Sequence, residues 1–188
     1  MGATGAVAIP THADRWVDDA RAGRSDGFDK LYQWLRGPVR GFAAARGAAD
    51  PDGVVNDVFL KAFRNMETFD GDGRAFRSWM FSTARHHLID EARKRARRPK
   101  MTDAEVPEVG SDAADVGALA SLGNERVASL LAELTGAQRE VIVLRVIADL
   151  SLSEVAEIVG RPTTAVKRLQ ARGLRALQQK ILDETVSE

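Results

Sequence analysis

The sequence has no cysteine among its 188 residues. This absence excludes disulfide bonds, thiolate metal sites and a thiol nucleophile, and it is typical of proteins of the reducing cytosol. No apolar run approaches the roughly 18 residues that a membrane-spanning helix needs. Aromatic residues are scarce as well, at 6% of the chain, and nothing indicates an extended β framework. We therefore expect a cytoplasmic protein without membrane insertion.

An excess of either charge is also missing, because 27 basic residues balance 27 acidic ones. A net charge of zero, taken alone, argues against nucleic-acid binding, but the charges are unevenly distributed along the chain. A basic stretch contains Arg85, Arg93, Lys94, Arg95, Arg97, Arg98 and Lys100. An acidic stretch follows, before the next basic residue at Arg126: Asp103, Glu105, Glu108, Asp112, Asp115 and Glu125. This pattern predicts a local anion-binding face and a separate acidic segment.

Apolar residues at three- and four-residue steps predict helices in both halves of the chain. In the first half, Gly37-Pro38 is expected to kink or split one helix. Residues 99–123 are rich in Ala, Gly, Ser, Pro and acids without helical period, which favours a flexible linker between domains that move independently. The predicted fold is all-α, divided into a disordered leader at 1–12, a small helical domain at 13–98, the acidic linker at 99–123, a second helical domain at 124–182 and a tail at 183–188.

The strongest local signal is a helix-turn-helix pattern at residues 150–169. Ser151 and Glu154 have the spacing of a capping box, which predicts a helix over 152–159. Ala156 is small enough for a close helix crossing, and Gly160 suits a turn with positive φ. A second helix over 163–182 then completes the motif.

The second helix of this motif carries side chains suited to a DNA groove. Long cationic side chains on such a helix can reach guanine edges or phosphates in the major groove. An ordinary helical hairpin with a solvated basic face is the alternative. The residues predicted to bind duplex DNA are Arg161, Thr163, Thr164, Lys167, Arg168, Ala171 and Arg172.

In the first domain, residues 76–95 place aromatic residues ahead of a basic helix end. Arginines attract phosphates, and aromatic or apolar walls can receive unstacked bases, as single-strand binding requires. The alternative for Trp79 is packing in the core. The residues predicted to contact melted DNA are Phe76, Trp79, Arg85, His86, His87, Arg93, Lys94 and Arg97.

No pattern for catalysis or for a metal site stands out. His86 and His87 are adjacent on a helix and do not face each other, and no third ligand follows at suitable spacing. No nucleophile–base arrangement, phosphate-binding glycine loop or paired carboxylates can be assembled. We therefore expect neither an enzyme nor a bound cofactor or metal.

These motifs, in this order, resemble the extracytoplasmic-function (ECF) sigma factors from about Asp14 to Gln179. Residues 50–69 look like the polymerase-binding helix of sigma region two, with Asn56, Asp57, Leu60, Lys61 and Arg64 as its contacts. Residues 76–98 resemble the part that captures and opens the minus-ten element, where His86 stands in place of the Asn of many relatives. Residues 125–180 resemble region four, whose helix reads the minus-thirty-five element. Two departures are Gly53, where an acid is common, and Arg168-Leu169-Gln170 in the recognition helix.

The resemblance implies a protein that binds core RNA polymerase and promoter DNA, directs promoter-specific initiation and melts the DNA locally. Many relatives are held by an anti-sigma factor, which is a further expected partner. In the family the linker threads the polymerase cleft, whereas composition alone fits a solvated tether equally well. The alternative functions are a stand-alone helix-turn-helix regulator and a protein-binding helical adaptor.

Overall fold

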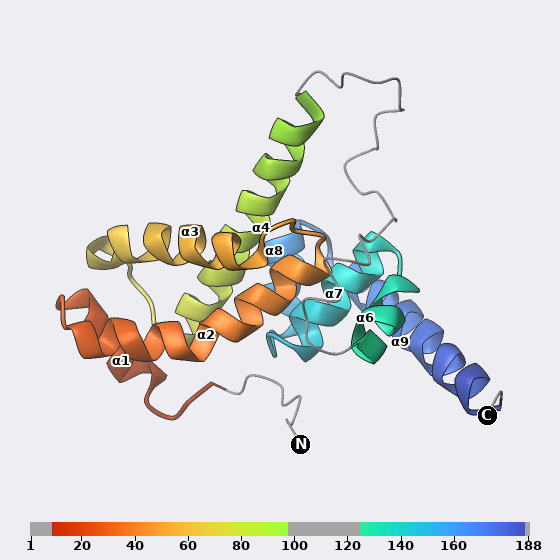
Figure 1. Ribbon diagram of the computed structural model, residues 1–188. Coiled ribbons are helices and arrows are strands. Elements are labelled where there is room, and N and C mark those ends of the chain that lie inside the picture. The colour runs from red at the N-terminus through yellow and green to blue at the C-terminus, as the bar shows by residue number, and fades with distance from the viewer. Residues whose placement is uncertain (1–8, 98–124, 187–188) are drawn as a thin grey trace.

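A computed structural model describes residues 9–97 and 125–186 of the chain. These residues are helical and contain no strand, which confirms the predicted all-α class (Figure 1). Most of the predicted leader and the linker at 99–123 lie outside the described residues. None of the described helices is long and apolar enough to cross a membrane.

The first domain contains four α-helices and one short 3₁₀ helix. They are α1 (Ala13–Arg21), α2 (Ser25–Ala45), α3 (Pro51–Arg64), η1 (Met66–Thr68) and α4 (Gly73–Arg97). Helix α3 begins as its sequence dictates, because Pro51 fits the first turn and the Asp50 carboxylate accepts a 2.9 Å hydrogen bond from Gly53 N. Val58 and Phe59 on the inner side of α3 are buried, as their place in the apolar pattern predicts.

Helix α2 continues through Gly37-Pro38 without a break. Of the two predicted outcomes, a kink or a split, the split was wrong. Proline lacks the N–H that would bond one turn back, but apolar residues on both sides of it, Leu35 and Val39, are fully buried in the same core. Their burial holds the chain helical across the missing bond.

The second domain contains α6 (Glu125–Ala132), α7 (Gly136–Val146), α8 (Leu152–Val159) and α9 (Thr163–Val186). The capping box of Ser151 and Glu154 is present, and Gly160 closes α8 with φ of 65°. Val155, Ile158, Val159 and Val166 are buried between α8 and α9. The helix-turn-helix is therefore confirmed, although α9 extends beyond residue 182, where the domain was expected to end.

The two domains pack against each other. Helix α2 contacts α7, and α4 contacts α8, so segments far apart in the sequence lie side by side (Figure 1). The buried apolar residues of both domains form one continuous cluster. Independent domains were expected from the linker composition, and the structure differs because α4 and the second domain offer each other complementary charges, described below.

Candidate nucleic-acid interface

Helix α9 and the turn before it carry the residues predicted to bind duplex DNA on their solvent side. Val166 is fully buried against α8, which leaves the opposite side of α9 exposed. The 3.6-residue period places Thr164, Lys167 and Ala171 on that exposed side. All seven predicted residues are exposed, from Arg161 and Thr163 through Arg172. Arg175 is exposed on the same side one turn further on, and the sequence analysis missed it although the helical spacing points to it.

Helix α4 divides the residues predicted to contact melted DNA among different faces. Trp79, His86, Arg93 and Arg97 recur at steps of seven, seven and four residues, which places them along one side of the helix. We call these four residues the open line. His86, Arg93 and Arg97 are exposed, whereas Trp79 is half-buried and stacks on Phe69 with ring centroids 5.1 Å apart.

Phe76 does not belong to that surface. Its ring is fully buried and packs edge-on against Phe69 and Trp79, at centroid distances of 5.6 and 5.9 Å. The sequence placed Phe76 among the DNA contacts because aromatic and basic residues follow one another there. The structure instead places it in the core beneath Trp79, where it supports the open line.

His87 and Lys94 turn towards α3. His87 Nε2 lies 3.7 Å from Asp57 Oδ2 on α3 and 3.8 Å from Glu91 Oε1 on its own helix. Together with Lys61, these residues and His86 line a hollow between the two helices. Residues predicted to bind polymerase and residues predicted to bind DNA therefore meet at one place.

The exposed edge of α3 is a second candidate surface. Its predicted polymerase contacts recur at four-residue steps along one side of the helix, and all of them are exposed. Leu60 is a large apolar side chain left in solvent between the polar ones. An apolar centre with a polar rim is common in protein–protein interfaces. The residues of this edge are Asn56, Asp57, Leu60, Lys61 and Arg64.

Arg85, also predicted to contact DNA, is occupied by the second domain. Its Nε donates a 3.0 Å hydrogen bond to Oε1 of Glu140 on α7, and the same oxygen lies 3.6 Å from Arg46 Nε. The Glu140 side chain is only 9% exposed. A buried carboxylate between two guanidinium groups is well compensated, so Arg85 is firmly paired in this arrangement.

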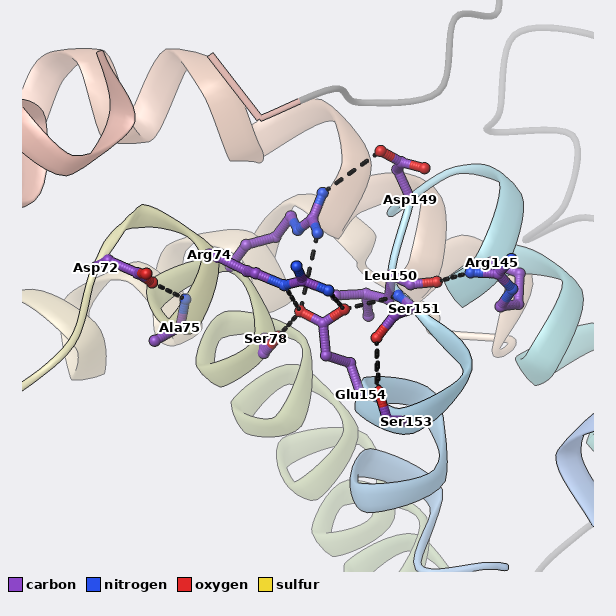
Figure 2. Close-up of polar contacts among 11 residues, drawn as sticks. Asp72, Arg74, Ala75, Ser78, Arg145, Asp149, Leu150, Ser151, Ser153 and Glu154 are labelled. Carbon is purple, nitrogen blue, oxygen red and sulfur yellow. Dashed lines mark hydrogen bonds and ion pairs between the residues drawn. The ribbon is translucent and has the colours of Figure 1, made fainter. Parts of the chain in front are cut away.

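Glu154 lies at the centre of a second cluster between the domains (Figure 2). Its two carboxylate oxygens accept hydrogen bonds from Arg74 Nε and Nη2, both at 3.1 Å, and from Ser78 Oγ at 2.8 Å. The same carboxylate accepts a bond of 2.7 Å from Ser151 N, the capping bond of α8. Burial alone would raise the pKa of Glu154, but the hydrogen bonds from Arg74, Ser151 and Ser78 outweigh burial and lower the pKa to about 2.

Arg77 joins this cluster from beneath. Its side chain is 2% exposed, with Nη1 3.7 Å from Asp149 Oδ2 and Nη2 3.9 Å from Glu154 Oε1. Burial lowers the pKa of Arg77, while Glu154 and Asp149 act in the opposite direction. Asp149 has a left-handed backbone with φ of 52°, which is uncommon outside glycine although Asp tolerates it better than most residues. The sequence did not reveal this cluster, because Arg74 and Glu154 are 80 residues apart.

Models of known families match parts of both domains. Residues 28–98 match the model of Sigma-70 region 2, and residues 130–179 match that of Sigma-70 region 4. The first match runs from the first turn of α2 to the end of α4, and the second contains the helix-turn-helix.

Several curated sigma factors are similar over most of the chain. The ECF RNA polymerase sigma factor SigD of Mycobacterium tuberculosis is 31% identical over 180 residues, covering 90% of this chain and 84% of that protein. CnrH of Cupriavidus metallidurans, an RNA polymerase sigma factor, is 34% identical over 188 residues, covering 93% and 96%. The ECF sigma factor BldN of Streptomyces coelicolor is 29% identical, and the match spans 89% of this chain but 65% of BldN.

Solved structures give the same result. CnrH in complex with the cytosolic domain of CnrY is 30% identical, with a TM-score of 0.63, and covers 92% of this chain and 98% of that one. The sigma factor RpoE of Bartonella quintana, in complex with the anti-sigma factor NepR, shares the fold at 22% identity, with a TM-score of 0.58 over 81% and 94% of the two chains.

The chain belongs to the ECF family of RNA polymerase sigma factors. Its function is promoter-directed transcription initiation by RNA polymerase, and the alternative of a stand-alone regulator is not favoured. From here on, the first domain is called region two and the second region four.

Proposed function

We propose that the two regions divide the work on the promoter. Region four anchors the upstream duplex through α9, and region two holds unstacked bases of the minus-ten element along the open line of α4. The observation that carries this proposal is the open line itself, in which a half-buried aromatic ring, an exposed imidazole and two exposed guanidinium groups succeed one another along one side of α4. Phosphates and flipped bases need this combination of charge and stacking surface.

The proposed role of the protein is to bind promoter DNA and polymerase, and the polymerase catalyses RNA synthesis. Opening follows from a higher affinity of region two for the melted strand than for the duplex. Unpairing and bending cost several kcal/mol, which two DNA anchors and the polymerase together can offset. The sigma factor family is not a family of catalytic enzymes, which supports this division.

Along α9, we assign base contacts to Lys167, Arg168, Ala171 and Arg172, with Arg161, Thr163 and Thr164 at the helix start touching phosphates. A helix entering the major groove reads bases from its first turns and is positioned by backbone contacts beside them. The burial of the opposite side of α9 against α8 supports this orientation.

The exposed edge of α3 is the proposed contact with core polymerase. Exposed Leu60 supplies apolar area there, and the charged side chains around it set orientation. Charge reversal at Asp57 is expected to weaken the complex without lowering the melting temperature. If both fall together, Asp57 is structural and the assignment fails.

We further propose that the protein acts in the cytoplasm and has an anti-sigma factor as a partner. The support for this partner comes from similar proteins. The structure of CnrH is known in complex with the cytosolic domain of CnrY, and that of RpoE in complex with the anti-sigma factor NepR. The division of the chain at 13–98 and 124–182 is kept as a proposal, supported by a family match inside each range.

The decisive experiment is run-off transcription by purified core polymerase with and without the protein, on genomic fragments, followed by mapping of the start sites. Discrete starts that depend on the protein are expected. The Asp57→Lys variant should lose them, whereas Glu67→Lys, which reverses an exposed charge in η1 that is not among the predicted polymerase contacts, should retain them. Absence of any protein-dependent start, despite stable binding of duplex DNA by the protein alone, would contradict the sigma function.

A further inference from the structure

The ring of Trp79 in the open line rests on a residue outside helix α4. Phe69, in the connection between η1 and α4, stacks on Trp79 with ring centroids 5.1 Å apart and an angle of 23° between the ring planes. Phe69 also packs edge-on against the fully buried Phe76. The backbone of Phe69 is extended, with φ of −70° and ψ of 120°, so helical hydrogen bonds do not fix it in place. The position of the Trp79 ring therefore depends on what holds Phe69.

Arg21, at the end of helix α1, holds the backbone of this connection. Its guanidinium donates from Nε to the carbonyl oxygen of Phe69 and from Nη2 to that of Gly71, both at 2.9 Å. The remaining nitrogen, Nη1, donates a 3.0 Å hydrogen bond to Oδ1 of Asp18, one turn earlier on α1. Three bonds from one planar group fix its orientation, and such charge-assisted bonds are stronger than neutral ones. We call the two bonds to Phe69 and Gly71 the α1 clamp.

The start of α1 holds the other end of the connection. Oδ1 of Asp14 accepts a 2.9 Å hydrogen bond from Gly73 N, one of the N–H groups that a helix start leaves without a partner inside the helix. A Cβ atom on Gly73 would lie 2.5 Å from Cβ of Ala13, so this close approach requires glycine. Asp72 caps α4 from its own side by accepting a 2.7 Å bond from Ala75 N. Helix α1 therefore fixes the connection at both of its ends.

The contacts predicted for DNA and polymerase all lie outside α1, on α3, on α4, on α9 and in the turn before α9. Helix α1 also precedes residues 28–98, which match the model of Sigma-70 region 2. The guanidinium of Arg21 is directed at the connection and at Asp18. An effect of Arg21 on promoter opening is therefore expected to pass through the connection to Trp79.

We propose that Arg21 is a positioning residue for promoter opening. By fixing Phe69, the α1 clamp holds the Trp79 ring in the orientation in which an unstacked base of the minus-ten element packs on it. A ring that is already held loses less conformational freedom when the base arrives than a mobile ring does, so the melted strand binds more tightly. This inference rests on the proposed role of the open line, whereas the clamp itself rests on the contacts alone.

The test variant is Arg21→Gln, which removes both the charge and the fork of donors. Arg15→Gln is the matched control, because Arg15 lies on the same helix and its loss changes the net charge equally. The Arg15 side chain is 81% exposed, and its ion pair with Asp19 is long, at 4.0 Å. A third variant, Phe69→Leu, removes the stacking ring but keeps the carbonyl oxygen that Arg21 bonds, so it separates the ring from the clamp.

Fluorine NMR reports on the Trp79 ring directly. The chain has three tryptophans, Trp16, Trp34 and Trp79, so incorporated 5-fluorotryptophan gives three resonances, which are assigned by replacing each tryptophan with phenylalanine in turn. In the full-length Arg21→Gln chain, the Trp79 resonance should shift or broaden, while that of Trp34 on α2 stays in place. Arg15→Gln should leave both unchanged. An unchanged Trp79 resonance in folded Arg21→Gln overturns the proposal.

Promoter opening is measured with the polymerase holoenzyme by permanganate footprinting. Arg21→Gln and Phe69→Leu are each expected to reduce the open complex about threefold, less than the loss from removing a stacking ring altogether. Because Arg21 acts through Phe69, the double variant should be no worse than Phe69→Leu alone. Additive losses overturn the proposal. If Arg21→Gln does not fold, Phe69→Leu decides, because an unchanged open complex in that variant overturns the proposal as well.

Trp79→Ala distinguishes a failure of this inference from a failure of the proposed function. If Trp79→Ala leaves the open complex unchanged, the open line has failed and the role of Arg21 in opening fails with it. If Trp79→Ala reduces the open complex and folded Arg21→Gln does not, the open line stands and the positioning role of Arg21 is overturned. The fluorine spectra are recorded without DNA or polymerase, so they decide whether the α1 clamp holds the Trp79 ring in either case.

Discussion

The two basic helices of the molecule carry similar charges but differ in what surrounds them. On α9, Lys167, Arg168 and Arg172 extend into solvent. On α4, Arg77 and Arg85 are held by carboxylates of region four. The number of cations in a helix therefore does not tell how many are available to DNA, since burial and pairing decide that. The comparison also separates stability from recognition: Arg77 and Arg85 of α4 hold the two regions together, whereas Lys167, Arg168 and Arg172 of α9 have no such role.

The largest expected effect tests this separation directly. Arg77→Ala should lower the free energy of unfolding by about 3 kcal/mol, because it removes a buried cation from Glu154 and Asp149. Arg168→Ala should change it by less than about 0.5 kcal/mol, as is usual for an exposed residue. Urea unfolding followed by circular dichroism measures both. Equal losses would remove the contrast between the helices.

A second prediction concerns recognition by α9. Arg172→Ala should lose roughly 1 to 3 kcal/mol of discrimination at one upstream base pair if its guanidinium makes a bidentate contact. Binding of the polymerase holoenzyme to promoters with single base-pair changes gives the measurement. Arg74→Ala on α4 is the control and should leave base preference unchanged. A uniform loss over all promoter variants would show that Arg172 contacts phosphate instead.

The open line of α4 gives the third prediction. His86→Ala should spare duplex binding and reduce the open complex by roughly tenfold, the loss expected when one stacking contact is removed. Permanganate footprinting on native and pre-melted templates measures it. Restoration on the pre-melted template supports a role in opening, whereas equal defects on both templates indicate base capture or folding. An unchanged open complex in both His86→Ala and Trp79→Ala would remove the open line from the mechanism.

The fourth prediction concerns pH. The pKa of Glu154 is lowered to about 2 in the folded chain, below the ordinary value of 4.5, so its charged form stabilises the protein. This contribution is fully present above about pH 4.5 and is lost as the pH falls towards 2. The difference in unfolding free energy between the native chain and Glu154→Gln should therefore be constant from pH 8 to 5 and shrink below pH 4.5. A difference that changes between pH 8 and 6 would assign the effect to another group.

Local features of the fold were predictable from sequence, and contacts between the regions were not. Ser151 and Glu154 are three residues apart, so their capping box could be read directly and the structure contains it. The contact of Glu154 with Arg74 depends on how two separate regions pack. The periodicity of apolar residues within each region gives no information about that packing. Phe76 shows a related limit: its neighbours in sequence suggested a binding surface, whereas its neighbours in space, Phe69 and Trp79, make it core.

The double use of the Glu154 carboxylate has a kinetic consequence. When region four leaves α4, Glu154 keeps its bond to Ser151 N and gains water, so α8 keeps its start and no helix has to refold. Opening then requires that the side-chain bonds and the apolar contacts between the regions break, while the domains themselves stay folded. Motions of this kind take microseconds to milliseconds. We expect the exchange between closed and open chains to fall in that range, which is fast enough for polymerase to capture open molecules as they appear.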